Sequence, residues 1–194
     1  MSQPQTDVST ADRILDSAET LVQTRGYNGF SYAHIAAALG ITKASLHYHF
    51  ASKAELGEAL IARYATRFAA ALDEIDRSTP DAGDQLGAYA ELYSGVLHGQ
   101  RMCLCGMLAA EYETLPRPMA EAIIRFFDAN QVWLARVLEE GRTAGTLAFD
   151  GDPLDAAQAI LAGLEGAMLI ARPYGDPARF DNAARRVLAG FARR

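Results

Sequence analysis

Residues 39–50 read LGITKASLHYHF, and this stretch decides how the chain is interpreted. Gly40 lies in a short turn, and Thr42 can cap the N-terminus of the segment that follows it. The preceding segment is opened by Ser31 and carries apolar residues at helical spacing, namely Ile35, Ala36 and Leu39. Two short helices joined by a glycine-containing turn form the helix-turn-helix unit, whose second helix enters the major groove of DNA.

The composition of the helix after the turn suits contact with DNA. Leu46 and Phe50, four residues apart, form an apolar stripe that is expected to face inward. The other side chains can donate hydrogen bonds to phosphate oxygens or base edges: Lys43, Ser45, His47, Tyr48 and His49. Lys53, in the first turn of the next helix, is expected to meet phosphate together with the positive end of that helix.

The charge distribution points to the same part of the chain. The 194 residues carry a formal net charge of −6, which excludes a uniformly basic protein that coats nucleic acid. No Asp or Glu occurs between Glu19 and Glu55, and residues 20–54 carry a formal charge of +3. The remaining 15 basic and 24 acidic residues give −9. A polyanion is therefore attracted to residues 20–54 and repelled by the rest of the molecule.

Helical patterns fill almost the whole chain, and no alternating β-pattern is longer than a few residues. The first helix is expected between a cap formed by Ser9 with Asp12 and a stop at Gly26. Ser52 with Glu55 predicts a capping box for a long fourth helix. Later helices are expected after the loop 78–83, at about 102–115, at 118–143, and after Asp152-Pro153 and Asp176-Pro177. The sequence predicts an all-α protein of about nine helices.

Two domains are expected: a helix-turn-helix DNA-binding domain over residues 8–56, and a larger helical domain for ligand binding and dimerisation over residues 57–194. Residues 1–8 are polar, and no apolar segment of a signal peptide follows them. The longest apolar run, 156–171, is shorter than the roughly 20 residues that cross a bilayer. We therefore expect a cytoplasmic protein without a membrane partner.

The sequence closely resembles the tetracycline-repressor (TetR) family. Residues 26–31 (GYNGFS), 35–40 (IAAALG) and 42–56 (TKASLHYHFASKAEL) carry the likeness. It implies operator contacts from nine residues: Tyr32, Thr42, Lys43, Ala44, Ser45, His47, Tyr48, His49 and Lys53. The family usually has tyrosine at the position of His47, so a contact there would vary with pH around neutrality. For His34 we expect a solvated or structural role.

The last two predicted helices are expected to pair two copies of the chain. Ala159, Gly163 and Ala167 recur every four residues in a helix that is apolar nearly all round, so a second backbone can approach closely. The resemblance implies a four-helix dimer interface, for which we expect Ala159, Gly163, Ala167, Phe180, Ala184, Leu188 and Phe191. The alternative is that both helices form core within one chain. A two-fold dimer predicts an inverted-repeat operator.

The resemblance also implies a cavity for a small-molecule effector among the middle helices. The candidate residues are mainly aromatic or sulfur-containing: Tyr64, Tyr89, Tyr93, Met102, Cys103, Met107, Glu111, Phe127, Asn130 and Trp133. Such side chains suit an apolar or aromatic molecule. The alternative is that they form ordinary core, since aromatic stripes at helical spacing are common there.

Cys103 and Cys105 are expected to be buried, inert thiols. On a helix, residues two apart point to nearly opposite sides, so this pair can neither chelate one ion nor form an unstrained disulfide. The alternative is a single thiol that senses oxidants or electrophiles, with a lowered pKa if Cys103 lies at a helix N-terminus. We expect no metal site and no cofactor.

The leading hypothesis is a homodimeric transcriptional regulator, a repressor that a small-molecule effector releases from double-stranded operator DNA. Two alternatives belong to other classes: a small all-α enzyme or cofactor-binding protein with an incidental helix-turn-helix, and a protein scaffold that never touches DNA. The sequence offers no nucleophile–base pair, metal cluster or glycine-rich phosphate loop, so we do not expect an enzyme.

Overall fold

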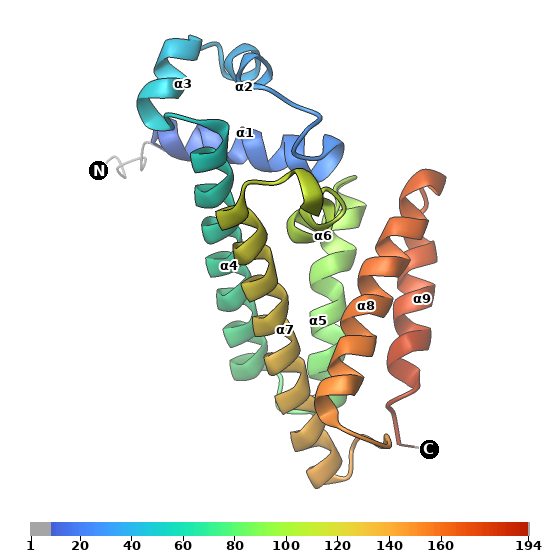
Figure 1. Cartoon of the computed structure of the whole chain (residues 1–194). Coiled ribbons are helices and arrows are strands. Elements are labelled where there is room, and N and C mark those ends of the chain that lie inside the picture. Colours follow the sequence, from blue (N-terminus) through green and yellow to red (C-terminus); the bar gives the residue numbers. More distant parts are fainter. Residues whose placement is uncertain (1–8, 194) are drawn as a thin grey trace, which may run out of the picture.

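The computed structural model describes residues 9–193, and within that range the regular elements are helices (Figure 1). The α-helices are α1 (Thr10–Arg25), α2 (Tyr32–Leu39), α3 (Lys43–His49), α4 (Lys53–Ser78), α5 (Ala82–His98), α6 (Leu104–Ala109), α7 (Arg117–Ala144), α8 (Pro153–Ala171) and α9 (Pro177–Ala189). Two short 3₁₀ helices follow α6 and α8, namely η1 (Tyr112–Thr114) and η2 (Arg172–Tyr174). The predicted all-α fold is confirmed.

The helices divide into a small head and a long body (Figure 1). The head consists of α1, α2 and α3, with α1 lying across the end of the body. α4 leaves the head and runs along the body beside α7, and α8 and α9 form a pair at the opposite side. α4 therefore belongs to both parts: it starts beside α3 and forms one wall of the body.

Polar side chains start the helices where the sequence predicts them. The Ser9 Oγ accepts from the Asp12 N–H at 3.1 Å, and the Thr42 Oγ1 accepts from the Ser45 N–H at 3.1 Å. Asp152 and Asp176 cap α8 and α9 in the same way, each followed by proline. His34 has a structural role, because its Nδ1 accepts from the Ser31 N–H at 3.0 Å and so closes the cap of α2.

One local prediction is wrong, and another is confirmed in its position only. The helix expected at about 102–115 is only the short α6, because Cys103 is its N-cap and the chain turns after Ala109. α1 does stop at Gly26, as predicted, but this glycine has φ 80° and ψ 170° and so is not in the left-handed helical conformation. A side chain at Gly26 would collide with the Glu111 carboxylate, whose Oε1 lies 2.9 Å from the position of a Cβ.

An aromatic cluster forms the centre of the body. Phe68 packs edge-to-face on Tyr89, Tyr93 and Phe126, with ring centroids 5.2–6.1 Å apart. Tyr89 also stacks on Trp133 at 5.5 Å, and its hydroxyl donates to the Asn130 Oδ1 at 2.9 Å. Because the few polar atoms inside the cluster bond to one another, they are satisfied without water.

Candidate nucleic-acid interface and its link to the body

α3 presents its polar face to solvent at the far end of the head. Leu46 is fully buried against the head core, which turns the opposite side of this short helix outward. Lys43 and Ala44 at its start are exposed, as is the capping residue Thr42. Tyr48 is 86% exposed, an unusual position for a large aromatic side chain. The helix thus offers a cation, an aromatic ring and hydrogen-bonding groups along one accessible face.

Tyr32 supports this face from beneath. It is buried, and its hydroxyl donates to the Phe50 carbonyl oxygen at 2.9 Å. Burial raises the pKa of Tyr32 to about 12. Its ring packs 4.8 Å from the imidazole of His47, which is exposed and has Nδ1 3.1 Å from the Ala51 carbonyl oxygen. The fold encloses the hydroxyl of Tyr32, but the residue also lines the hollow that Lys43 and His47 line, so its contact with DNA stays a prediction.

A hollow of about 340 Å³ lies between the start of α2 and α3, and Lys43, His47 and Lys53 line it. The Lys53 Nζ donates to the carbonyl oxygens of Tyr27 and Phe30, both at 2.6 Å, and lies over both aromatic rings. Burial lowers the pKa of Lys53. An ammonium group has three donors, so Lys53 braces the turn and keeps one N–H for another acceptor.

In the part of the chain that the structure describes, α3 keeps its polar face free of ion pairs, whereas Glu111, from outside residues 20–54, lies against Tyr27 and Asn28. Within residues 9–193, no ion pair involves a residue of α3. Glu55, the first carboxylate after residues 20–54, accepts from the Ala51 N–H at 3.0 Å and so takes part in the start of α4. Ser45 and His49 are half-buried at the edges of the exposed face.

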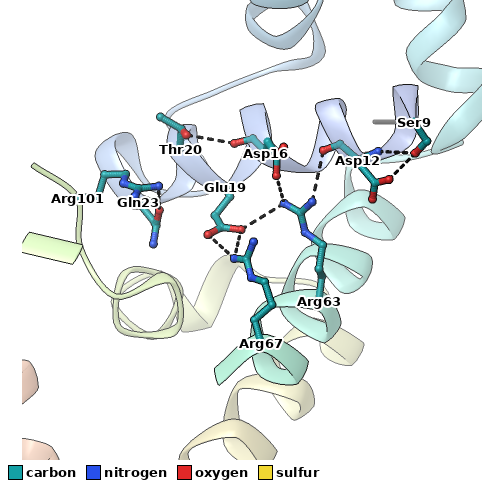
Figure 2. A network of polar contacts seen from close by, with 9 residues as sticks. All are labelled: Ser9, Asp12, Asp16, Glu19, Thr20, Gln23, Arg63, Arg67 and Arg101. Atoms are coloured by element: carbon teal, nitrogen blue, oxygen red, sulfur yellow. Dashed lines mark hydrogen bonds and ion pairs between the residues drawn. The ribbon is translucent and has the colours of Figure 1, made fainter. Parts of the chain in front are cut away.

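Two arginines of α4 hold α1 through a buried carboxylate (Figure 2). Glu19 of α1 is buried, and its oxygens accept from the Arg67 Nη2 at 2.5 and 2.6 Å. Arg63 pairs with Asp16 at 2.8 Å and with Glu19 at 3.3 Å. Removing one member would leave a buried charge without its partner, so these contacts fix the angle between α1 and α4.

A second connection joins the turn after α1 to the segment after α6. Glu111 Oε2 accepts from the backbone N–H of Tyr27 at 2.5 Å, and both of its oxygens lie within 3.3 Å of the Asn28 N–H. The Asn28 Nδ2 donates to the Thr114 Oγ1 at 2.7 Å. Glu111 was predicted to contact a ligand; in the structure its carboxylate instead holds the head to the body, and the ligand contact stays untested.

A groove of about 760 Å³ runs between α4 and α7. Its floor includes Phe68, Phe126 and Asn130, and six of the other lining residues are alanines of the two helices. Of the ten predicted ligand residues, Asn130 lines this groove. Tyr89, Tyr93 and Trp133 lie in the aromatic cluster directly behind its floor, as their contacts with Phe68 and Asn130 indicate.

The other predicted ligand residues are distributed through the body. Tyr64 is buried, with its hydroxyl 3.8 Å from the Cys103 Sγ, and Phe127 is half-buried against Phe126. Met102 and Met107 lie near the head: the Met102 N–H donates to the Gln23 carbonyl oxygen at 3.2 Å, and the Met107 Sδ lies 3.0 Å from the Arg172 Nη1. The structure therefore does not bring all ten residues to one cavity.

Both cysteines are buried, as predicted. Cys103 does lie at a helix N-terminus, where its Sγ is 3.5 Å from the Gly106 N–H. Burial nevertheless raises the pKa of the Cys103 and Cys105 thiols well above the ordinary value. The alternative of a low-pKa thiol at this position is therefore wrong, because the cost of burying a thiolate exceeds the effect of one N–H donor. Within residues 9–193, no group of three or more His, Cys, Asp or Glu side chains could hold a metal.

Glu165 is a notable residue that sequence reasoning missed. Its Oε1 is buried and has no hydrogen-bond partner within the described part of the chain. Its carboxyl group occupies the space above Gly106, where a side chain would collide with it. Burial raises the pKa of Glu165 to about 7. The available signal was an acidic residue in the middle of a long and largely apolar helix.

The residues predicted for the dimer interface do not share one surface. Phe180 and Ala184 are buried inside the protomer, and Gly163 packs on Val187 of α9, so these three residues already belong to the core of one chain. Their part in a contact between chains stays a prediction. Ala167, Leu188 and Phe191 are half-buried against the same core, whereas Ala159 is exposed. The outer face of α8 instead carries Ala159, Ala162, Gly166, Leu169 and Ile170.

By length and composition alone, the segment Pro153–Tyr174 is apolar enough to cross a membrane, with a mean hydropathy of 1.4 over its best window. It extends beyond the run 156–171, so the expectation that this region is too short is wrong. In the fold, α8 packs between α7 and α9. Only 33% of the apolar window is buried there, which leaves an apolar outer face.

Known proteins share both the head and the body. A family model described as "Bacterial regulatory proteins, tetR family" matches residues 14–60, and one described as "Tetracyclin repressor-like, C-terminal domain" matches residues 82–187. Transcriptional regulator AcuR from Cereibacter sphaeroides is 34% identical over 152 residues, covering 76% of this chain and 69% of that protein. HTH-type transcriptional repressor NemR from Escherichia coli is 29% identical over 171 residues, covering 86% of each.

Solved structures give the same result over nearly the full length. A TetR-family regulator from Agrobacterium tumefaciens superposes with a TM-score of 0.91 at 36% identity, covering 94% of this chain and 97% of that one. A TetR regulator from Legionella pneumophila gives a TM-score of 0.87 at 33% identity, covering 96% and 100%. The chain therefore belongs to the tetR family of bacterial regulatory proteins and is a DNA-binding transcriptional regulator.

Proposed function

We propose that the protein is a homodimeric repressor that binds an inverted-repeat operator and leaves it when a small-molecule effector binds the body. The observation that carries this proposal is the exposed face of α3 on a part of the chain without acidic residues. A similar protein, NemR, is named a repressor. Because the target is chromosomal DNA, we place the protein in the cytoplasm.

DNA recognition is assigned to the exposed start and side of α3. Lys43 and Thr42 would reach phosphate oxygens, while Ala44 and Ser45 would face base edges in the major groove. Tyr48 would lie flat against the sugar–phosphate backbone, which accounts for its 86% exposure in the free protein. His47, His49 and the remaining N–H of Lys53 are proposed to add phosphate contacts around the hollow beside α2.

Dimerisation is assigned to the outer face of α8. The small residues Ala159, Ala162 and Gly166 would let the α8 of a second copy approach closely, because a side chain at Gly166 would meet no atom of its own protomer. Leu169 and Ile170, 58% and 65% exposed, would be covered by the partner. A two-fold axis there would set the distance between two recognition helices.

Effector binding is assigned to the groove between α4 and α7. Its volume of about 760 Å³ is within the range of small-molecule sites. Phe68 and Phe126 would contact an apolar or aromatic ring, and Glu58, Glu121 and Arg125 at the rim would meet polar substituents. Of the predicted residues, we retain Asn130 as a direct contact and treat Tyr89, Tyr93 and Trp133 as its support.

α4 offers the physical connection between effector and DNA. The same helix lines the groove with Ala62 and Thr66 and holds α1 with Arg63 and Arg67 (Figure 2). An effector that prefers a different angle between α4 and α7 would also change the position of the head. Effector and operator would then bind antagonistically, each weakening the affinity of the other by the same factor.

The experiment is a fluorescence-anisotropy titration of the full chain with an inverted repeat from its own promoter region, at several salt concentrations. We expect saturable binding that weakens as salt rises, because phosphate contacts release counterions. Lys43→Gln should weaken operator binding at least tenfold and flatten the salt dependence. Arg77→Gln removes the same charge at the far end of α4 and should leave the affinity unchanged. Equal affinities for the two variants would remove Lys43 from the contact set.

The alternative of a small all-α enzyme is not favoured, since the similar proteins are named as transcriptional regulators. Turnover of a metabolite by the DNA-free protein would support the enzyme alternative.

A further inference from the structure

A second cavity, of about 410 Å³, lies where the body meets the head. The end of α5 and the loop 99–103 form one wall, and the end of α8, η2 and the first residue of α9 form the other. The last turn of α1 lies against the same region, because the Met102 N–H donates to the Gln23 carbonyl oxygen at 3.2 Å. This cavity is separate from the groove between α4 and α7, and the two share no lining residue.

Two arginines from different segments line this cavity: Arg101 in the loop and Arg172 in η2. The backbone fixes Arg101, because α5 ends with Gln100 in the left-handed region, at φ 57°, and with a hydrogen bond from the Arg101 N–H to the Val96 carbonyl oxygen at 3.1 Å. This arrangement directs Arg101 toward α1 (Figure 2).

Neither guanidinium has a carboxylate partner within residues 9–193. The Arg101 Nη1 donates to the amide oxygen of Gln23 at a long 3.3 Å. Arg172 donates to the Thr24 carbonyl oxygen and lies 3.0 Å from the Met107 Sδ. All three acceptors are neutral, so a negatively charged group would replace them with stronger, charge-assisted hydrogen bonds.

The acidic side chains near this cavity already have partners. Asp176 caps α9 by accepting from the Ala178 N–H at 3.1 Å. Asp181 accepts from the Ser94 hydroxyl at 2.7 Å and pairs with His98 at 3.3 Å. Asp176, which also lines the cavity, keeps its negative charge, so two guanidinium groups and one carboxylate leave the lining with a net positive charge.

We propose that this cavity binds a small metabolite through a compact oxyanion, a carboxylate or phosphate group, held between Arg101 and Arg172. A planar guanidinium presents two parallel N–H donors that match two oxygens of such a group, and two arginines from opposite walls can hold it on both sides. Met102 and Leu97 supply apolar wall beside the charged end, so the ligand has room for a short carbon skeleton.

Binding at this position is coupled to the head. Arg101 and Arg172 now hold Gln23 and Thr24, in the last turn of α1. An anion that recruits both guanidinium groups competes with these contacts and so alters the attachment of α1. The anion and the operator therefore influence each other through α1, independently of a ligand between α4 and α7.

The test is isothermal titration calorimetry of the DNA-free full chain with two probes, inorganic phosphate and succinate, against chloride at constant ionic strength. We expect saturable binding of at least one probe. Arg101→Gln and Arg172→Gln should each weaken it at least tenfold, whereas Arg77→Gln, which removes an exposed arginine at the far end of α4, should not change it. Binding of phosphate alone identifies a phosphorylated ligand, and binding of succinate alone identifies a carboxylate.

Folding of the variants is checked by thermal unfolding, and Arg172→Lys, which keeps the charge but loses the planar fork, should bind with intermediate affinity. The proposal is overturned if neither probe binds saturably, or if both glutamine variants bind as tightly as the unsubstituted protein. Because these measurements use no DNA, failure of operator binding would leave their outcome intact, and the two proposals can fail separately.

Discussion

The hydroxyl of Tyr32 lies inside the head, directly beneath the exposed face of α3. Its hydrogen bond to the Phe50 carbonyl oxygen closes the space between α2 and the end of α3. Tyr32→Phe should therefore lower the free energy of unfolding by about 1 kcal/mol, the usual effect of losing one such bond. Operator affinity, measured by anisotropy where the variant is folded, should stay within twofold. A larger loss of affinity would show that the hydroxyl contacts DNA.

Glu165 makes the stability of the body depend on pH. Its pKa is raised by burial from 4.5 to about 7 in the folded protein, so the fold favours the protonated form. Below pH 4.5 the carboxyl group is protonated in both the folded and the unfolded chain, and the free energy of unfolding is highest. As pH rises from about 4.5 to 7, the unfolded chain loses the proton first, so the folded protein becomes less stable.

Glu165→Gln replaces the carboxyl group with a neutral group of the same size and should remove this loss. We expect equal stabilities at pH 4.5 and a variant more stable by about 1–3 kcal/mol at pH 8. Urea unfolding at a series of pH values measures the difference. Glu91→Gln changes an exposed carboxylate, so the stability of this variant should depend on pH in the same way as that of the unsubstituted protein. If the difference in stability between Glu165→Gln and the unsubstituted protein is the same at every pH, Glu165 is not the source of the pH dependence.

At the scale of helices, close approaches depend on particular glycines. Gly141 lies in α7 where α5 begins, and a Cβ there would lie 2.5 Å from the Leu147 Cδ1 and 2.7 Å from the Ala82 Cβ. Glycine costs about 1 kcal/mol in a helix relative to alanine, so helix propensity does not explain this residue and close packing does.

Gly141→Ala should destabilise the protein by about 1–2 kcal/mol, because overpacking exceeds the gain in helix propensity. Gly87→Ala is the matched control on α5, where an added Cβ meets no atom within 4 Å. That substitution should raise stability by up to about 1 kcal/mol. Chemical denaturation measures the free energy of unfolding of both variants. If Gly141→Ala is more stable than the unsubstituted protein, α5 and α7 can move apart at little cost.

At the scale of the whole molecule, the proposed dimer interface on the outer face of α8 can be tested through the oligomeric state. Leu169→Glu places a charge on a side chain that is 58% exposed in the protomer, so the monomer should remain folded while the dimer weakens at least tenfold. Ile124→Glu, on α7 at 46% exposure, is the control and should leave the dimer intact. Sedimentation equilibrium distinguishes the two. A Leu169→Glu variant that still dimerises would move the interface elsewhere.

The sequence by itself determined the helices and the nature of the head. Caps at Ser9, Thr42, Ser52, Asp152 and Asp176 act within a few residues, so they could be located without the fold. The buried position of Leu46 and the exposure of Lys43 followed from the period of a short helix. The absence of acidic residues over 20–54 is also a property of the chain alone.

Only the tertiary structure decided which polar and small side chains face a partner from a distant segment. Glu111 contacts residues 83 and 84 positions away, and Glu19 contacts arginines 44 and 48 positions away; no local pattern encodes such distances. The rotation of α8 placed Gly163 against α9 and Gly166 outward. A helix that is apolar all round has no periodic signal to fix that rotation, so packing against its neighbours has to supply it.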